Sequence, residues 1–245
     1  MQFLGHVVAA GQLRVDEDKL NKLALWESPL KTTKQVRQIM GFLSYYRAFV
    51  PNFAMVTAPL TDLLKGKSKT IEWTNEAEEA MRNSKRLLWD ACSRYAWDAG
   101  RENRVTTDAS GTGIGATLEQ KVEGVGWAPV SFWSRKLAAA ETRYSVTDQE
   151  WLAVVEAVTR QWRHWLKGRR FVLRMDHGPL VQILMKKGEE FSNRQTRWLE
   201  RLGDFTFEVI HLPGTENKAA DALSRSHIVS ALEIGEEAKK HQLRG

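Results

Sequence analysis

The chain has 245 residues, of which 42% are hydrophobic and 27% charged, so its composition predicts a globular protein without a membrane span. A net charge of +6 and a pI of about 9.4 favour a polyanion such as nucleic acid as partner, or else a basic solvated surface. The one cysteine, Cys92, excludes an internal disulfide and a cysteine-based zinc cluster, and it favours an intracellular location. No signal peptide is recognisable at the start of the sequence.

Residues 1–15 have the pattern of a hairpin that turns near Ala10-Gly11, and residues 16–95 have mostly helical patterns. Thr32 or Thr33 can cap a helix whose apolar residues recur at helical spacing, namely Val36, Ile39, Met40, Leu43 and Tyr46. A second helix is predicted after Trp73, with Asn75 and Glu78 as its capping box.

The pattern changes near residue 100, where strands begin to alternate with helices. We predict strands at 103–109, 113–120, 126–134, 170–176 and 205–211. Helices are predicted at about 147–167, 178–187, 193–203 and 217–225. This order predicts an α/β fold with a five-stranded mixed sheet and flanking helices. Residues 227–245 are polar and are interpreted as a tail or linker.

Residues 106–115, TTDASGTGIG, place one acid, Asp108, before three glycines. An aspartic-protease loop would need Asp-Thr/Ser-Gly, which this order does not supply. A dinucleotide-binding turn would need a helix after Gly115, but another strand is predicted there. The glycines are therefore interpreted as a tight hairpin turn, which leaves Asp108 as a carboxylate at a strand end.

Three later acids occupy places from which they can reach Asp108, and each also has an ordinary structural explanation. Glu150 follows Thr147 by three residues, as in a capping box. Asp176 ends the fourth predicted strand and resembles a turn residue. Asp221 lies in the first turn of the last helix, where the helix dipole favours an acid. Four converging carboxylates would repel one another unless divalent cations neutralise them, so the set also predicts a two-metal nuclease that uses Mg²⁺ or Mn²⁺.

Five motifs in this order closely resemble the ribonuclease H domain of gypsy-type LTR retrotransposon polyproteins: TTDASGTGIGATLEQ, VSFWSRKL, YSVTDQEWLAVVEAV, WRHWLKGRRFVLRMDHGPL and HLPGTENKAADALSR. Upstream, FLGHVV resembles the end of the reverse-transcriptase palm, and VRQIMGFLSYYRAFVPNFAMVTAPLTDLL resembles the thumb. The resemblance implies a palm remnant with a primer-grip-like hairpin (1–15), a helical thumb or connection segment (16–99), a ribonuclease H-like domain (100–226) and the tail (227–245).

The resemblance also implies roles for the acids. Asp108 would bridge two Mg²⁺ ions, and Asp221 would complete the site of the ion that activates water. Glu150 and Asp176 would hold the ion that stabilises the leaving 3′ oxygen. His211 would assist proton transfer or product release, or is an ordinary exposed histidine at a strand end. Asn217 would contact the nucleic acid or cap the last helix.

The implied substrate is the RNA strand of an RNA–DNA hybrid, which differs from DNA by its 2′-hydroxyl groups. The resemblance implies no small-molecule cofactor, and it implies a location in the cytoplasm, a virus-like particle or the nucleus. Candidate phosphate contacts are Arg160, Arg163, Arg169, Arg194 and Arg197, because residues 160–201 hold 11 Lys or Arg against 4 Asp or Glu.

Some positions depart from the family pattern. Met175 and Gly178 replace a common threonine and lysine, and Asp148-Gln149 replaces an acid–lysine pair. The polymerase motif Tyr-x-Asp-Asp has no counterpart, since no Asp-Asp pair occurs in the sequence. Polymerisation would therefore need a palm elsewhere in a parent polyprotein. Two alternatives to a nuclease are a non-catalytic nucleic-acid-binding module and an inactive fragment of a retroelement.

Overall fold

The computed structural model describes residues 1–212, apart from residues 4, 10, 67, 92–93 and 186–190. The expected helix at 217–225, with Asn217 and Asp221, and the tail at 227–245 lie outside the described residues. Among the helices of the described part, none combines the length and the apolar character needed to cross a membrane.

The chain begins with the predicted hairpin. Strand β2 (His6–Ala9) pairs antiparallel with β3 (Gln12–Val15), and β1 (Gln2–Phe3) adds to the other side of β2. Strand β4 (Arg94–Tyr95) completes the sheet in the order β1-β2-β3-β4. Strand β3 precedes the helices of the first part and β4 follows them, so the pairing of these two strands brings the two ends of the helical segment together.

The helical segment, residues 17–89, packs around its own apolar core. The stripe predicted on helix α2 (Thr33–Tyr45) is buried, and Thr32 caps this helix in a capping box with Gln35. The other buried residues of this core come from all parts of the segment, among them Leu23, Leu60 and Leu88. Its elements are α1 (Glu17–Ala24), α2 (Thr33–Tyr45), the short helix η1 (Arg47–Phe49), α3 (Phe53–Val56), α4 (Ala58–Asp62) and α5 (Asn75–Trp89).

The predicted capping box of α5 is wrong by one residue. The N-cap is Thr74, whose hydroxyl accepts a hydrogen bond from the Ala77 amide at 3.2 Å. Glu78 turns away from the helix end, because it accepts hydrogen bonds from the Ser28 hydroxyl and the Trp73 indole, each at 2.7 Å. With Thr74 as the N-cap, Ala77 occupies the third helical position, so Glu78 is one residue too late for a capping box.

Replacing Thr74 with alanine is expected to lower the free energy of unfolding by about 1 kcal/mol, the usual cost of losing an N-cap. Asn75→Ala is the matched control and should change stability by less than about 0.5 kcal/mol, because Asn75 is an exposed first helical residue. Urea denaturation of both variants measures the difference. If Asn75→Ala lost more stability than Thr74→Ala, Asn75 would be the N-cap, as the sequence predicted.

The second part of the chain forms the predicted five-stranded mixed sheet, in the order β7-β6-β5-β8-β9. The first three strands are antiparallel, whereas β8 is parallel to β5 and β9 is parallel to β8. Four of the five predicted strands differ from the structure by one or two residues at an end, and the first is unchanged. The strands are β5 (Asn103–Ala109), β6 (Gly113–Val122), β7 (Gly126–Lys136), β8 (Arg170–Met175) and β9 (Thr206–His211).

The long helix predicted at about 147–167 is instead three consecutive pieces, α6 (Val146–Glu156), a π-helical turn (Ala157–Gln161) and α7 (Arg163–Leu166). The wider turn is marked by the Trp162 amide, which donates to the Ala157 carbonyl at 2.9 Å. All residues from Gln149 to Glu156 are buried, because the sheet covers one side of α6 and two further helices, α8 (Gly178–Met185) and α9 (Asn193–Leu202), pack on it as well.

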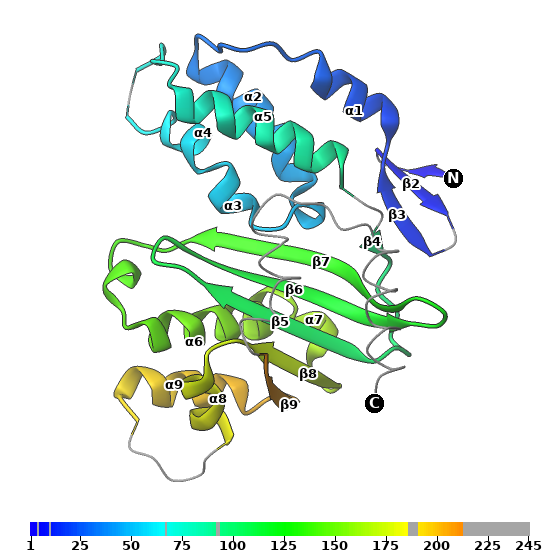
Figure 1. Ribbon diagram of the computed structural model, residues 1–245, viewed down its shortest axis with the longest axis vertical. Helices are drawn as coiled ribbons and strands as arrows, with labels where there is room; N and C mark the ends of the chain where they lie inside the picture. The colour runs from blue at the N-terminus through cyan, green and yellow to red at the C-terminus, as the bar shows by residue number, and fades with distance from the viewer. Residues whose placement is uncertain (4, 10, 67, 92–93, 186–190, 213–245) are drawn as a thin grey trace, which may run out of the picture.

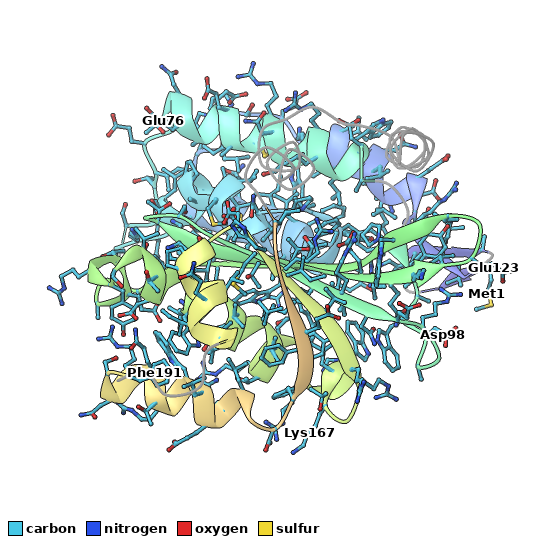
Figure 2. The ribbon with its side chains drawn as sticks, turned by 60° about the horizontal axis from the view of Figure 1, so that its bottom comes forward. Met1, Glu76, Asp98, Glu123, Lys167 and Phe191 are labelled. Atoms are coloured by element: carbon cyan, nitrogen blue, oxygen red, sulfur yellow. The ribbon has the colours of Figure 1, made fainter. Side chains whose placement is uncertain are left out.

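The helical segment lies on one side of the large sheet, while α6, α8 and α9 lie on the other (Figures 1 and 2). Polar contacts join the segment to β7. The Ala54 amide donates to the Ser134 hydroxyl at 2.9 Å, and the Lys136 ammonium lies 2.7 Å from the Asp62 carboxylate. Arg94 donates to the Val130 carbonyl at 2.9 Å and places its guanidinium 4.6 Å from the centre of the Phe49 ring.

Of the three glycines predicted to form the turn, Gly111 lies in it, but Gly113 and Gly115 have a different role. The β5–β6 hairpin does turn here, but Ser110 makes the turn, since its hydroxyl and backbone bond to Gly113. Gly113 and Gly115 lie within β6, beneath the helical segment. A Cβ on Gly115 would lie 2.8 Å from Asn52 Oδ1, and one on Gly113 would collide with Met55 Sδ. These two glycines permit close packing between the two parts of the chain.

Candidate active site

Two neighbouring parallel strands bring Asp108 and Asp176 together. Thr106 of β5 lies opposite Arg174 of β8. Asp108 and Asp176 are each two residues further along in the same direction, so they also lie side by side. Asp108 lies near the end of β5, and Asp176 directly follows β8. Both carboxylates therefore lie at the carboxyl ends of adjacent strands, where open α/β sheets bind ligands.

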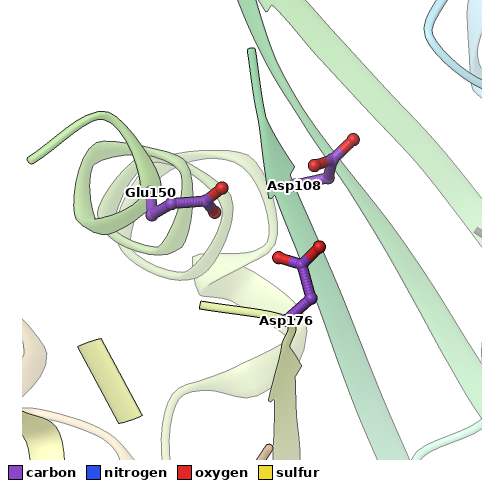
Figure 3. Close-up of side chains that lie close together, drawn as sticks. All are labelled: Asp108, Glu150 and Asp176. Atoms are coloured by element: carbon purple, nitrogen blue, oxygen red, sulfur yellow. The ribbon is translucent and has the colours of Figure 1, made fainter. Parts of the chain in front are cut away.

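Glu150 reaches the same place from α6. The predicted capping box with Thr147 is wrong, because the N-cap is Ser145, whose hydroxyl accepts from the Asp148 amide at 3.1 Å. Glu150 lies beyond the first turn, so capping does not account for its side chain. It points from the helix toward the two strand ends (Figure 3).

The three carboxylates converge. One oxygen from each of Asp108, Glu150 and Asp176 lies within 4.8 Å of the other two. Asp108 and Asp176 remain partly exposed, whereas Glu150 is 4% exposed. The three residues span 68 positions of the sequence, from Asp108 to Asp176, so the fold is what brings them together.

Burial raises the pKa of Glu150 to about 8, with further increases from the negative charges of Asp108 and Asp176. The Ala109 amide donates a hydrogen bond to the Glu150 carboxylate, which lowers the pKa but does not offset the burial. Glu150 Oε2 is buried without a hydrogen-bond partner in the described part of the chain. A buried acceptor of this kind is costly, so the site favours a proton or a cation at this oxygen.

These residues fit a divalent cation. Three carboxylate oxygens are the hard ligands that Mg²⁺ prefers. Ligands about 2.1 Å from one ion lie roughly 3 to 4.2 Å from one another, which agrees with the 4.8 Å limit on the observed separations. Asp221, the predicted fourth ligand, lies outside the described residues.

Two histidines flank Asp176. His211 is the last residue of β9, opposite Met175, and its Nε2 lies 3.1 Å from the Asp176 carbonyl. His177 follows Asp176 directly, and its Nδ1 accepts a hydrogen bond from the Leu180 amide at 3.1 Å, which caps α8. The sequence carries no signal for this role of His177, because histidine is not a residue whose type predicts a helix cap.

The five arginines predicted as phosphate contacts lie on the π-helical turn, α7, the loop before β8, and α9, and each makes a contact within the chain. Arg160 pairs with Glu156, Arg163 pairs with Asp204, and Arg197 donates to the Asn193 carbonyl of its own helix. The Arg169 guanidinium lies 4.9 Å from the centre of the Trp97 ring. Their contact with nucleic acid stays a prediction.

Arg194 has the most extensive of these contacts. It donates to the Asp148 carboxylate at 3.0 Å, and its guanidinium lies 3.7 Å from the centre of the Tyr144 ring. Gln195 donates to the other oxygen of Asp148 at 2.9 Å. Asp148 is two residues before Glu150, so these contacts fix α9 to the start of the helix that carries Glu150.

We expect Arg194→Ala to lower the free energy of unfolding by about 1 kcal/mol, from the lost cation–π contact and the charge-assisted hydrogen bond. Arg197→Ala is the control, because it leaves the contacts to α6 in place. The two variants and the unmodified chain are compared by urea denaturation. Equal stability of all three would mean that the Arg194 contacts contribute nothing measurable.

Comparison with known proteins gives two kinds of sequence relationship. Residues 98–205 match the family model described as the RNase H-like domain found in reverse transcriptase. The polyproteins of transposons Tf2-3 and Tf2-4 of Schizosaccharomyces pombe are each 33% identical to this chain over 227 residues. The match covers 92% of this chain but 17% of each polyprotein, so the chain spans about a sixth of these relatives.

Solved structures share the fold. The foamy viral protease-reverse transcriptase in complex with RNA/DNA hybrid matches with a TM-score of 0.72 and 20% identity, over 94% of this chain and 31% of that one. The same enzyme in complex with dsDNA gives 0.71 and 21% identity, over 87% and 45% of the two chains. The match extends across both the helical segment and the large sheet.

Proposed function

We propose that this chain, whose residues 98–205 belong to the RNase H-like domains found in reverse transcriptases, hydrolyses the RNA strand of RNA–DNA hybrids with divalent cations. The convergence of Asp108, Glu150 and Asp176 carries the proposal. A binding module would need no such cluster, since three close carboxylates repel a phosphate backbone unless cations lie between them.

Asp108, Glu150 and Asp176, with Asp221 as the fourth ligand, would hold two Mg²⁺ ions. When bound, such ions lower the pKa of the attacking water and neutralise the charge that develops on the phosphodiester. Asp108 is proposed as the shared ligand, because the family resemblance implies this role and because Asp108 lies near the end of the central strand β5. Glu150 has to lose its proton to bind a cation, since its pKa of about 8 keeps it largely protonated at neutral pH.

His211 is proposed to transfer a proton near Asp176. When its Nε2 carries the proton, this nitrogen donates to the Asp176 carbonyl 3.1 Å away, and Nδ1 is left as the acceptor. The hydrogen bond would fix the orientation of the ring beside the carboxylates. Preference for RNA would come from contacts with the 2′-hydroxyl groups.

The activity is tested with the purified chain and an end-labelled RNA–DNA hybrid in Mg²⁺. Double-stranded DNA and double-stranded RNA of the same sequence serve as controls, and EDTA removes the cations. We expect cleavage of the RNA strand of the hybrid alone, and none with EDTA. A chain that binds the hybrid but leaves it intact would instead be a nucleic-acid-binding module.

A further inference from the structure

A small groove lies beside Asp108 where the helical segment meets the large sheet. It offers about 30 Å³, enough for a water molecule or one polar group of a ligand. The sheet contributes Asp108, its partner Gly115 and neighbouring residues of β5, β6 and β7, while the helical segment contributes Pro51 and Asn52. The groove therefore joins a predicted metal ligand to a residue from the other part of the chain.

Asn52 has an unusual conformation for its position. Its φ of 49° and ψ of 29° are left-handed, and among the described residues it is the non-glycine residue with positive φ. Asparagine tolerates this region better than most residues, at a cost of about 1–2 kcal/mol. An asparagine before a helix commonly caps it, but here the side chain does not cap α3. The backbone carbonyl accepts from Met55 and Val56 instead, which leaves the carboxamide at the groove.

Contacts with β6 and β7 hold the residues around Asn52 in this position. Asn52 Oδ1 lies so close to Gly115 that a side chain there would collide with it, and Met55 packs in the same way on Gly113. Two residues after Asn52, the Ala54 amide donates to Ser134 of β7 at 2.9 Å. The position of Asn52 relative to Asp108 is therefore set by packing and by a hydrogen bond.

We propose that Asn52 is a substrate-positioning residue of the nuclease site, whose carboxamide contacts the sugar–phosphate backbone held at Asp108. An amide suits this place because it offers a donor to phosphate and hydroxyl oxygens without adding charge beside three carboxylates. The helical segment would then supply one wall of the site. This inference rests on the proposed function, since its ligand is the nucleic acid that the carboxylates act on.

The test measures the affinity of the full chain for a fluorescent RNA–DNA hybrid, with Ca²⁺ in place of Mg²⁺, and then kcat and KM in Mg²⁺. Asn52→Gly removes the amide and retains the left-handed backbone. Asn52→Asp retains shape and backbone preference but replaces the donor with a negative charge. Asn83→Ala, at an exposed position of α5, is the control. Thermal melting confirms that each variant is folded.

We expect both Asn52 variants to bind the hybrid about tenfold more weakly, the equivalent of one lost hydrogen bond to a charged group, and to raise KM more than they lower kcat. The control should behave as the unmodified chain. If Asn52→Asp bound as tightly as the unmodified chain, the residue would serve packing alone and the proposal would be overturned. A chain that binds but never cleaves the hybrid would refute the nuclease function, while the affinities would still decide the role of Asn52.

Discussion

Replacing Asp108 with asparagine is expected to reduce hybrid cleavage by about 10³-fold or more, which corresponds to at least about 4 kcal/mol of transition-state stabilisation. Asparagine has nearly the same shape, so β5 and its pairing with β6 should persist. The change removes one negative charge from a cluster whose oxygens lie within 4.8 Å of one another. Under the proposed mechanism, the cations would lose the ligand that they share, and the developing charge on the phosphodiester would no longer be neutralised.

The measurement compares initial rates in Mg²⁺ for the unmodified chain, Asp108→Asn and Glu102→Gln. Glu102 is an exposed acid that pairs with Lys121, so its change should leave the rate unaffected. Equal cleavage by Asp108→Asn and the unmodified chain would refute the assignment of the active site. A loss in both variants would point to a general effect of charge on hybrid binding.

Much of the fold was predictable because its signals are local. The β-prone residues Val105, Thr106 and Thr107 predicted the strand β5, and the structure shows the period of two that a strand imposes, with odd-numbered residues from Asn103 to Thr107 buried and even-numbered ones half-buried. The stripe on α2 was predictable for the same reason. The motif resemblance to gypsy-type retrotransposon polyproteins is confirmed by the family match and by the Tf2 relatives.

What the sequence did not predict depends on contacts between distant residues. Asn75 and Glu78 have the spacing of a capping box, yet Thr74 is the cap, and the Glu78 carboxylate accepts hydrogen bonds from Trp73 and from Ser28, 50 residues earlier. Gly113 and Gly115 look like turn residues in their own segment, and the reason for them is Met55 and Asn52 on another element. No local pattern distinguishes a glycine needed for a turn from one needed for close packing.

The candidate site was predictable in part, because its residues have local signals but their convergence depends on the fold. Each acid had an ordinary explanation from its neighbours, and for Glu150 that explanation failed when Ser145 proved to be the cap. Strand order supplied the missing information, because β5 and β8 are adjacent and parallel. The role of Asn52 had no recognisable signal, since an asparagine between a proline and a short helix predicts a cap.

The raised pKa of Glu150 makes the stability of the metal-free chain depend on pH. An acid whose pKa is 4.5 when unfolded and about 8 when folded keeps its proton in the native state over this range. The native state then binds more protons than the unfolded state, so the free energy of unfolding falls as pH rises from about 5 to 8. Glu150→Gln lacks this titration. Between pH 5 and pH 8 in EDTA, the free energy of unfolding of Glu150→Gln should therefore rise by on the order of 3 kcal/mol relative to that of the unmodified chain.

Urea denaturation at pH 5, 6.5 and 8 measures this gain. Glu156→Gln is the matched control, because Glu156 is a buried acid of the same helix that pairs with Arg135 and Arg160, and its loss should destabilise the chain. Mg²⁺ at pH 8 should stabilise the unmodified chain more than Glu150→Gln, since the cation takes the place of the proton. If the two chains lost stability in parallel as pH rose, Glu150 would already be ionised without a cation. Oε2 would then have a partner other than a proton, and the raised pKa of Glu150 would be refuted.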